Sequence, residues 1–158
     1  MKSTKFMLQA AAIAAVYATL TLILMPLSYG VMQVRVSEAL TILPFFTPAA
    51  IPGLFIGCLV SNMVGPNGIL DMIIGSGATL IAAFFSYLLR NKPLLVPIPP
   101  IIANGILIGG MLHYAYSVPF SLAVCILWVG LGELIACYGI GYPLLRYLIK
   151  YKKIFELH

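Results

Sequence analysis

Long stretches without any charged side chain dominate this sequence. Residues 6–34, 39–70, 72–89, 93–132 and 134–145 contain no Asp, Glu, Lys or Arg. Charged residues make up only 8% of the chain, whereas a water-soluble surface needs about a quarter of all residues charged. The charge-free runs therefore predict a protein that lies in lipid.

The length of the chain limits what else it can hold. At about 20 residues per helical span, 158 residues allow about six or seven spans and no separate soluble domain. No lysine follows a glycine, which excludes the Gly-Lys-Ser/Thr end of an ATP-binding phosphate loop. We therefore expect no cofactor, and any ATP-driven work must come from partner subunits.

Prolines, glycines and charges divide the chain into six predicted helices. Pro44, Pro48 and Pro52 break the second apolar run, and the segment 65–68 (Gly-Pro-Asn-Gly) is a turn. The predicted helices cover residues 6–25, 37–47, 53–64, 69–89, 97–114 and 118–151. The expected fold is an all-α integral membrane protein with six transmembrane helices in one domain, residues 1–158.

The basic residues predict the orientation of this bundle. With the N-terminus inside, eight of the nine fall on the cytoplasmic side, as the positive-inside rule requires. These are Lys2, Lys5, Arg90, Lys92, Arg146, Lys150, Lys152 and Lys153. Both termini are therefore expected in the cytoplasm, and the basic excess reflects topology, with no nucleic-acid partner expected.

One acidic residue, Glu133, falls inside the sixth predicted span. It lies thirteen residues before Arg146, a rise of about 20 Å, past the bilayer centre. An ionisable group at that depth costs at least about 2.5 kcal/mol, so Glu133 needs a partner, a wet cavity or a ligand. Asn104 is expected near the same depth. In the alternative interpretation, Asn104 or Tyr138 merely satisfies the carboxyl.

A second candidate is the polar segment after the first helix. Gln33, Arg35 and Ser37 alternate with two valines, which places three polar groups on one side of an extended segment. Such a segment can line an outward-facing cavity. The alternative is a solvated loop with an Arg35–Glu38 ion pair.

Two weaker candidates lie around the next turn. Asn67 precedes Gly68, as in many turns, and Asp71 suits the first turn of a helix because of the helix dipole. Neither residue type is specific to binding in these positions.

No catalytic or metal-binding constellation stands out. His113 falls at an outer helix end with no second histidine nearby, and His158 is terminal. The three cysteines have no Cys-x-x-Cys spacing and lie in apolar runs, so we expect small buried thiols.

Alanines crowd the first predicted helix. Ala10, Ala14 and Ala18 recur every fourth residue, with Ala11 and Ala15 alongside. Small residues at this spacing let helices approach closely in lipid. The face can therefore dock another membrane protein, or it can pack inside this chain, where Gly53 with Gly57 and Gly105 with Gly109 would also permit close helix packing.

The whole chain resembles the substrate-binding S components of energy-coupling factor (ECF) transporters, and more specifically the QueT family. The resemblance rests on the Ala-x-x-x-Ala first helix, the string 34–44 (VRVSEALTILP), the segment 53–58 (GLFIGC) and the stretch 99–105 (PPIIANG). The string Arg-Val-Ser-Glu-Ala-Leu is its most specific part, whereas the alanine motif is common to many S components.

This resemblance implies a receptor in the bacterial cytoplasmic membrane for a 7-deazaguanine queuosine precursor. The receptor would act with a transmembrane T component and two cytosolic ATPases. A carboxylate, Glu133 or Glu38, would accept from the guanine-like edge. Asn104 would contact the carbonyl or a ring nitrogen, and Asp71 or the other glutamate would balance a cationic arm.

The resemblance also implies roles for aromatic and alanine side chains. Tyr114, Tyr116 or Trp128 would stack on the base. Ala10, Ala14 and Ala18, with Ala11 and Ala15, match the positions of the family's coupling motif. Two alternatives stay open: an S component for another vitamin or nucleobase, and an autonomous small membrane transporter.

Overall fold

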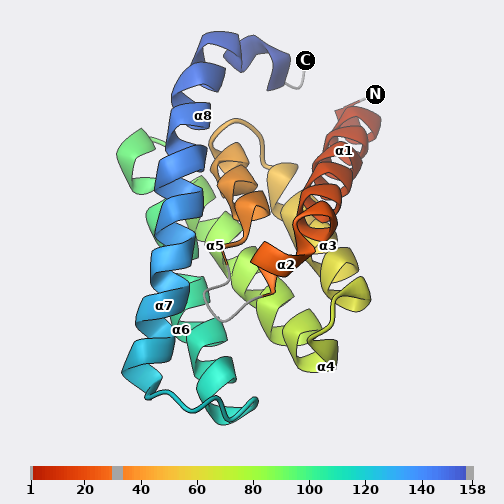
Figure 1. The fold of residues 1–158 in the computed structure, drawn as a ribbon. Helices are drawn as coiled ribbons and strands as arrows, with labels where there is room; N and C mark the ends of the chain where they lie inside the picture. The colour runs from red at the N-terminus through yellow and green to blue at the C-terminus, as the bar shows by residue number, and fades with distance from the viewer. Residues whose placement is uncertain (1, 30–33, 156–158) are drawn as a thin grey trace.

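The computed structural model describes residues 2–29 and 34–155, and this part of the chain is helical with no strand. Figure 1 shows a bundle of long and short helices. The prediction of an all-α protein is confirmed for these residues. Gln33, one of the predicted site residues, lies outside them.

The helices of the first half are α1 (Lys2–Ile23), α2 (Met25–Ser28), the 3-10 helix η1 (Val36–Phe45) and α3 (Ala50–Val64). A continuous segment follows, made of α4 (Gly68–Leu70), the π-helix η2 (Asp71–Gly75) and α5 (Ser76–Leu88). The second half contains η3 (Pro93–Leu95) and α6 (Ile98–Tyr114). A last long segment joins α7 (Leu122–Leu134), the π-helix η4 (Ile135–Gly141), α8 (Tyr142–Leu148) and η5 (Ile149–Phe155).

Four helical segments of the described chain are long and apolar enough to cross a membrane: Ser3–Ile23, Gly68–Leu88, Pro93–Tyr114 and Leu122–Lys152. Two shorter apolar helices, Val36–Phe45 and Ala50–Val64, complete the set of six apolar helices in this part of the chain. Ten residues in 3-10 geometry rise only about 20 Å, less than the hydrocarbon core of about 30 Å. Six complete spans therefore stay a prediction.

One proline, Pro52, lies inside a helix that we expected to begin after it. We expected a helix from residue 53, after Pro52, but α3 begins at Ala50 and includes Pro52 in its first turn. A proline is tolerated there because the first N–H groups of a helix have no intrahelical partner.

Glycines let α1 and α3 approach closely. A Cβ on Gly53 would lie 2.8 Å from the carbonyl oxygen of Ala10, and one on Gly57 would lie 2.8 Å from that of Ala14. No real side chain fits at such distances, so these two glycines set the contact between the helices.

The two ends of the described chain lie at the same end of the bundle (Figure 1). Arg90, after α5, and Lys152, in η5, line one pocket, which places two of the predicted cytoplasmic cations together. The side of the membrane that this end faces stays a prediction.

The surface of the described chain is rich in apolar side chains, and its three acidic residues are all buried. Exposed large residues include Met7 and Leu8 on α1, Ile73 on η2 and Leu127 on α7. Glu38, Asp71 and Glu133 are at most 3% exposed. Apolar side chains outside and acids inside are the reverse of a soluble protein, and the chain is a multi-pass membrane protein.

Candidate functional site

Glu38, the third residue of η1, stands at the centre of a buried polar cluster. Its Oε1 accepts hydrogen bonds from the Tyr17 hydroxyl of α1 and, at 3.0 Å, from the Thr79 hydroxyl of α5. All three side chains are fully buried. Helices from three parts of the chain thus converge on one carboxylate.

Arg35 lies just before η1 and is only 4% exposed. Its Nη2 lies 3.5 Å from Oδ2 of Asp71, and its Nη1 lies 3.5 Å from Sγ of Cys58. The guanidinium carbon is also 5.2 Å from the centre of the Tyr29 ring. The alternative of a solvated loop with an Arg35–Glu38 ion pair is therefore wrong, because Arg35 is buried and its ion pair is with Asp71.

Glu133 brings the last long helix into the same cluster. The Cys137 thiol, one turn further along, donates to its Oε2 at 3.6 Å, and the Asn104 side chain of α6 lies next to the same carboxyl. Glu38 is close enough to interact with Glu133 electrostatically. The Tyr138 hydroxyl instead donates to the carbonyl oxygen of Leu94, so Tyr138 is not the partner of Glu133.

Two π-helical segments place groups in this cluster. Asp71 opens η2, and Cys137 lies in η4, directly after the turn that carries Glu133. A π-turn widens the helix and changes which side chains share a face, and such turns are frequent at functional sites. The Asn62 amide donates to the carbonyl oxygen of Asp71 at 2.9 Å and so holds one widened turn against α3.

Tyr29, directly after α2, is a further member of the cluster. Its hydroxyl donates to the carbonyl oxygen of Ser61 at 2.8 Å and lies 3.1 Å from Oδ1 of Asn62. Burial raises the pKa of the Tyr29 hydroxyl, against the opposing effect of Arg35, so the phenol stays a hydrogen-bond donor at neutral pH.

The cluster has more acidic groups than basic ones. Within the described residues it gathers three carboxyls, Glu38, Asp71 and Glu133, around one guanidinium, that of Arg35. Two buried carboxyl oxygens, Oε2 of Glu38 and Oδ1 of Asp71, have no hydrogen-bond partner among the described residues. Buried acceptors are normally paired, so this arrangement is suited to a cationic ligand with several N–H donors.

Asn67, the other candidate of the turn before Asp71, and Tyr116 lie next to the cluster. The Asn67 side chain lies beside the Asp71 carboxyl, and the Tyr116 hydroxyl donates to the carbonyl oxygen of Asn67. Partial burial, together with the charge of Asp71, raises the pKa of Tyr116. The hydrogen bond of Tyr116 thus joins the α6–α7 connection to the turn that precedes Asp71.

The other two aromatic candidates lie at the surface. Tyr114 is 74% exposed at the end of α6, and Trp128 is 44% exposed on α7. Neither has a described contact with the cluster. A ligand bound in the buried cluster would therefore not stack on these two side chains.

The alanines of α1 divide between two faces. Ala10 and Ala18 are buried and Ala14 is half-buried on the face that packs on Gly53 and Gly57. Ala11 and Ala15 are exposed. Packing within the chain thus accounts for the first set, and only the second set offers an external surface.

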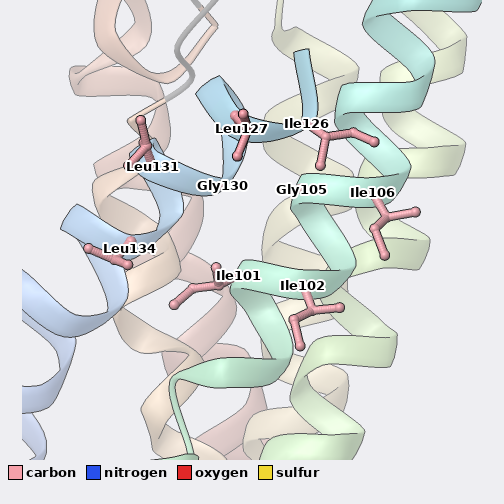
Figure 2. A pocket seen from close by; sticks show the side chains of 9 residues that line it. All are labelled: Ile101, Ile102, Gly105, Ile106, Ile126, Leu127, Gly130, Leu131 and Leu134. Atoms are coloured by element: carbon pink, nitrogen blue, oxygen red, sulfur yellow. The ribbon is translucent and has the colours of Figure 1, made fainter. Parts of the chain in front are cut away.

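An apolar groove of about 370 Å³ runs between α6 and α7 (Figure 2). It is lined by Ile101, Ile102, Gly105, Ile106, Ile126, Leu127, Gly130, Leu131 and Leu134. Such a lining offers no polar side chain to a base, so the polar cluster is the better candidate for a polar ligand.

Sequence reasoning missed several members of the cluster, among them Tyr17, Cys58 and Thr79. Sγ of Cys58 accepts from Thr79 at 3.4 Å, from Asn62 at 3.4 Å and from Arg35. The cysteines are free and buried, as predicted. In the sequence, the one available signal was Tyr17, a polar ring among the alanines of the first helix.

These features define a multi-pass helical membrane protein that encloses a polar, acid-rich cluster. The model of the QueT transporter family matches residues 7–150. The chain therefore belongs to the QueT transporter family, and the resemblance seen in its sequence is confirmed.

The queuosine precursor transporter QueT of Lactococcus lactis subsp. cremoris (strain MG1363) is 37% identical to this chain over 84 residues. The aligned part covers 52% of this chain and 49% of that relative, so the chain spans about half the length of the curated relative it matches. No solved structure matches this chain.

Proposed function

We propose that this chain is the substrate-binding S subunit of an ATP-driven ECF uptake transporter in the bacterial cytoplasmic membrane. Its substrate would be a queuosine precursor, a 7-deazaguanine captured from outside the cell. Membership of the QueT transporter family and the name of the L. lactis relative support this proposal. The observation that carries it is the buried cluster of three carboxyls around one guanidinium.

The pairing of Glu133 with Asn104 suits one edge of the base. A guanine-like edge presents two adjacent donors, an N–H and an NH2 group, next to a carbonyl oxygen. A carboxylate accepts from both donors, and an amide NH2 donates to the carbonyl. Since Asn104 lies next to the Glu133 carboxyl, the two side chains offer these groups side by side. Glu38 is the alternative acceptor for the two donors of this edge.

The two unpartnered carboxyl oxygens suit a cationic arm. Oε2 of Glu38 and Oδ1 of Asp71 are buried acceptors without a described partner. An aminomethyl group carries a positive charge and three N–H donors, which would satisfy them and offset the acidic excess. The cluster therefore favours a precursor with an aminomethyl arm over one with a neutral nitrile.

The exposed face of α1 is the proposed contact with the T component. Ala11 and Ala15 lie on the surface, where small side chains permit the close approach of another membrane helix. Two cytosolic ATPases would supply the energy. In this arrangement the chain itself is not an enzyme and uses no cofactor.

Isothermal titration of the purified protein in detergent tests the binding proposal. The ligands are 7-aminomethyl-7-deazaguanine, its nitrile analogue and guanine. We expect the aminomethyl compound to bind most tightly and guanine much more weakly. If none of the three binds to folded protein, the queuosine-precursor assignment is wrong, and an S component for another vitamin or nucleobase becomes the better description.

Co-purification from the native membrane tests the subunit role. We expect the chain to bring down a membrane subunit and two ATPases. Uptake of the ligand by proteoliposomes that contain this chain alone would contradict the proposal and support an autonomous small transporter.

A further inference from the structure

A pocket of about 220 Å³ opens at the end of the bundle where the described chain begins and ends. It is lined by Phe45, Phe46, Pro48, Tyr87, Arg90, Asn91 and Lys152. These residues come from the end of η1, the turn before α3, the end of α5 and η5. The pocket is separate from the polar cluster, because none of its lining residues belongs to that cluster.

Two cations meet in this pocket from distant parts of the chain. The guanidinium carbon of Arg90 lies 4.0 Å from the centre of the Tyr87 ring, which fixes its position by a cation–π contact. Lys152 approaches from η5, and Asn91 adds an amide that can donate. Guanidinium, ammonium and amide donors in one concave site are suited to a phosphate group.

No described carboxylate neutralises these cations. The three acidic residues of the described chain are all buried in the polar cluster, where Asp71 pairs with Arg35. The remaining acidic residue, Glu156, lies outside the described residues. Among the described residues, the pocket thus brings together two cations and no carboxylate.

The surroundings of the pocket place it at the membrane surface. Next to its lining residues, Leu88 and Tyr151 are exposed, at the end of the apolar segments Gly68–Leu88 and Leu122–Lys152. Phe45 and Phe46 pack edge to face, with ring centres 4.8 Å apart, and form an apolar wall. Aromatic and basic side chains together at the ends of spanning helices are typical of the headgroup region.

We propose that this pocket binds the phosphate of an anionic phospholipid headgroup. Arg90 and Lys152 would bind the phosphate oxygens, Asn91 would donate to the headgroup, and the two phenylalanines would contact the glycerol region. Basic pockets between spanning helices bind anionic headgroups in other membrane proteins. The site does not depend on which substrate the polar cluster binds.

Native mass spectrometry of the delipidated full-length chain tests this proposal. The protein is titrated in detergent with phosphatidylglycerol and with phosphatidylcholine of the same acyl chains. We expect a preference for phosphatidylglycerol. The double variant Arg90→Gln/Lys152→Gln is expected to lose about tenfold or more of this binding, because it removes both charge-assisted contacts to the phosphate.

A matched control separates a site from general attraction. Lys92→Gln/Lys150→Gln removes the same charge from the same end, but neither residue lines the pocket. We expect this variant to keep phosphatidylglycerol binding within about twofold, since it retains the pocket. An equal loss in both double variants, or equal binding of the two lipids, overturns the proposal.

Two further measurements complete the test. If inorganic phosphate at millimolar concentration displaces phosphatidylglycerol, the ligand is a free phosphate and the lipid proposal is wrong. If the first double variant unfolds, Asn91→Glu places a carboxylate in the intact pocket and is expected to abolish the lipid preference. Retention of that preference by folded Asn91→Glu protein would also overturn the proposal.

Discussion

Nη2 of Arg35 lies 3.5 Å from Oδ2 of Asp71, across 36 residues of sequence, and both side chains are shielded from solvent. Charge-assisted N–H to O hydrogen bonds are normally shorter, about 2.7 to 2.9 Å. The pair is therefore loose, and Oδ1 of Asp71 has no hydrogen-bond partner in the part of the chain that the structure describes. This contact joins the start of η1 to the π-turn before α5 and holds together one side of the polar cluster.

The first prediction concerns this ion pair. Removal of one partner leaves a buried charge uncompensated, so Arg35→Gln or Asp71→Asn is each expected to lower the free energy of unfolding by about 3 kcal/mol. The double variant should lose less than the sum of the two, by at least about 1 kcal/mol. The measurement is reversible unfolding of ligand-free protein in detergent, with the exposed Lys92→Gln as control. Additive losses would show that the two groups do not interact.

The second prediction concerns ligand recognition by Glu133. Glu133→Ala removes the proposed acceptor of the base edge and is expected to weaken 7-deazaguanine binding by at least about 1 to 3 kcal/mol. Trp128→Ala, on the exposed side of α7, should leave binding unchanged. Titration calorimetry compares the two. Wild-type affinity in a folded Glu133→Ala protein would remove Glu133 from the site.

Much of the helical framework could be predicted from charges, prolines and glycines. The sequence indicated a helix over 97–114, and the structure has α6 at Ile98–Tyr114. It also indicated that Glu133 and Asn104 lie near one depth, and their side chains meet. These features could be inferred because a charge in lipid and a proline inside a helix are both energetically costly. Each therefore indicates a particular position in the fold.

The details of the cluster could not be predicted. Both π-turns depend on how neighbouring helices pack, and the segments around Asp71 and Cys137 look like ordinary apolar helix in sequence. The pairing of Arg35 with Asp71, rather than with the adjacent Glu38, depends on the same packing. Cys58 and Thr79 carry no sequence signal, because a lone thiol or hydroxyl in an apolar helix is usually ordinary core.

The third prediction concerns the contact between α1 and α3. Gly57→Ala puts a Cβ 2.8 Å from both the Ala14 carbonyl oxygen and the Tyr17 Cβ. Overpacking of this kind costs about 1 to 3 kcal/mol, and here it also displaces the donor to Glu38. We therefore expect lower stability and weaker ligand binding, measured by thermal unfolding and calorimetry.

The matched control for this variant is Gly110→Ala. Gly110 lies in α6, and nothing lies within 4 Å of the Cβ that it would gain. Alanine is the better helix former by up to about 1 kcal/mol, so this change should be neutral or stabilising. Equal destabilisation by both substitutions would argue against a specific close contact at Gly57.

The fourth prediction separates the two faces of the alanine helix. Ala15 is exposed, whereas Ala14 is half-buried and its backbone lies against Gly57. Ala15→Leu is therefore expected to leave folding and ligand binding intact but to abolish co-purification with the proposed T component, since the added bulk keeps the partner helix away. Ala14→Leu should instead lower the stability of the chain itself. The measurements are pull-down from native membranes and thermal unfolding of each purified variant. If Ala15→Leu keeps the partner subunits at wild-type levels, the exposed alanines are a lipid-facing surface and the T component binds elsewhere.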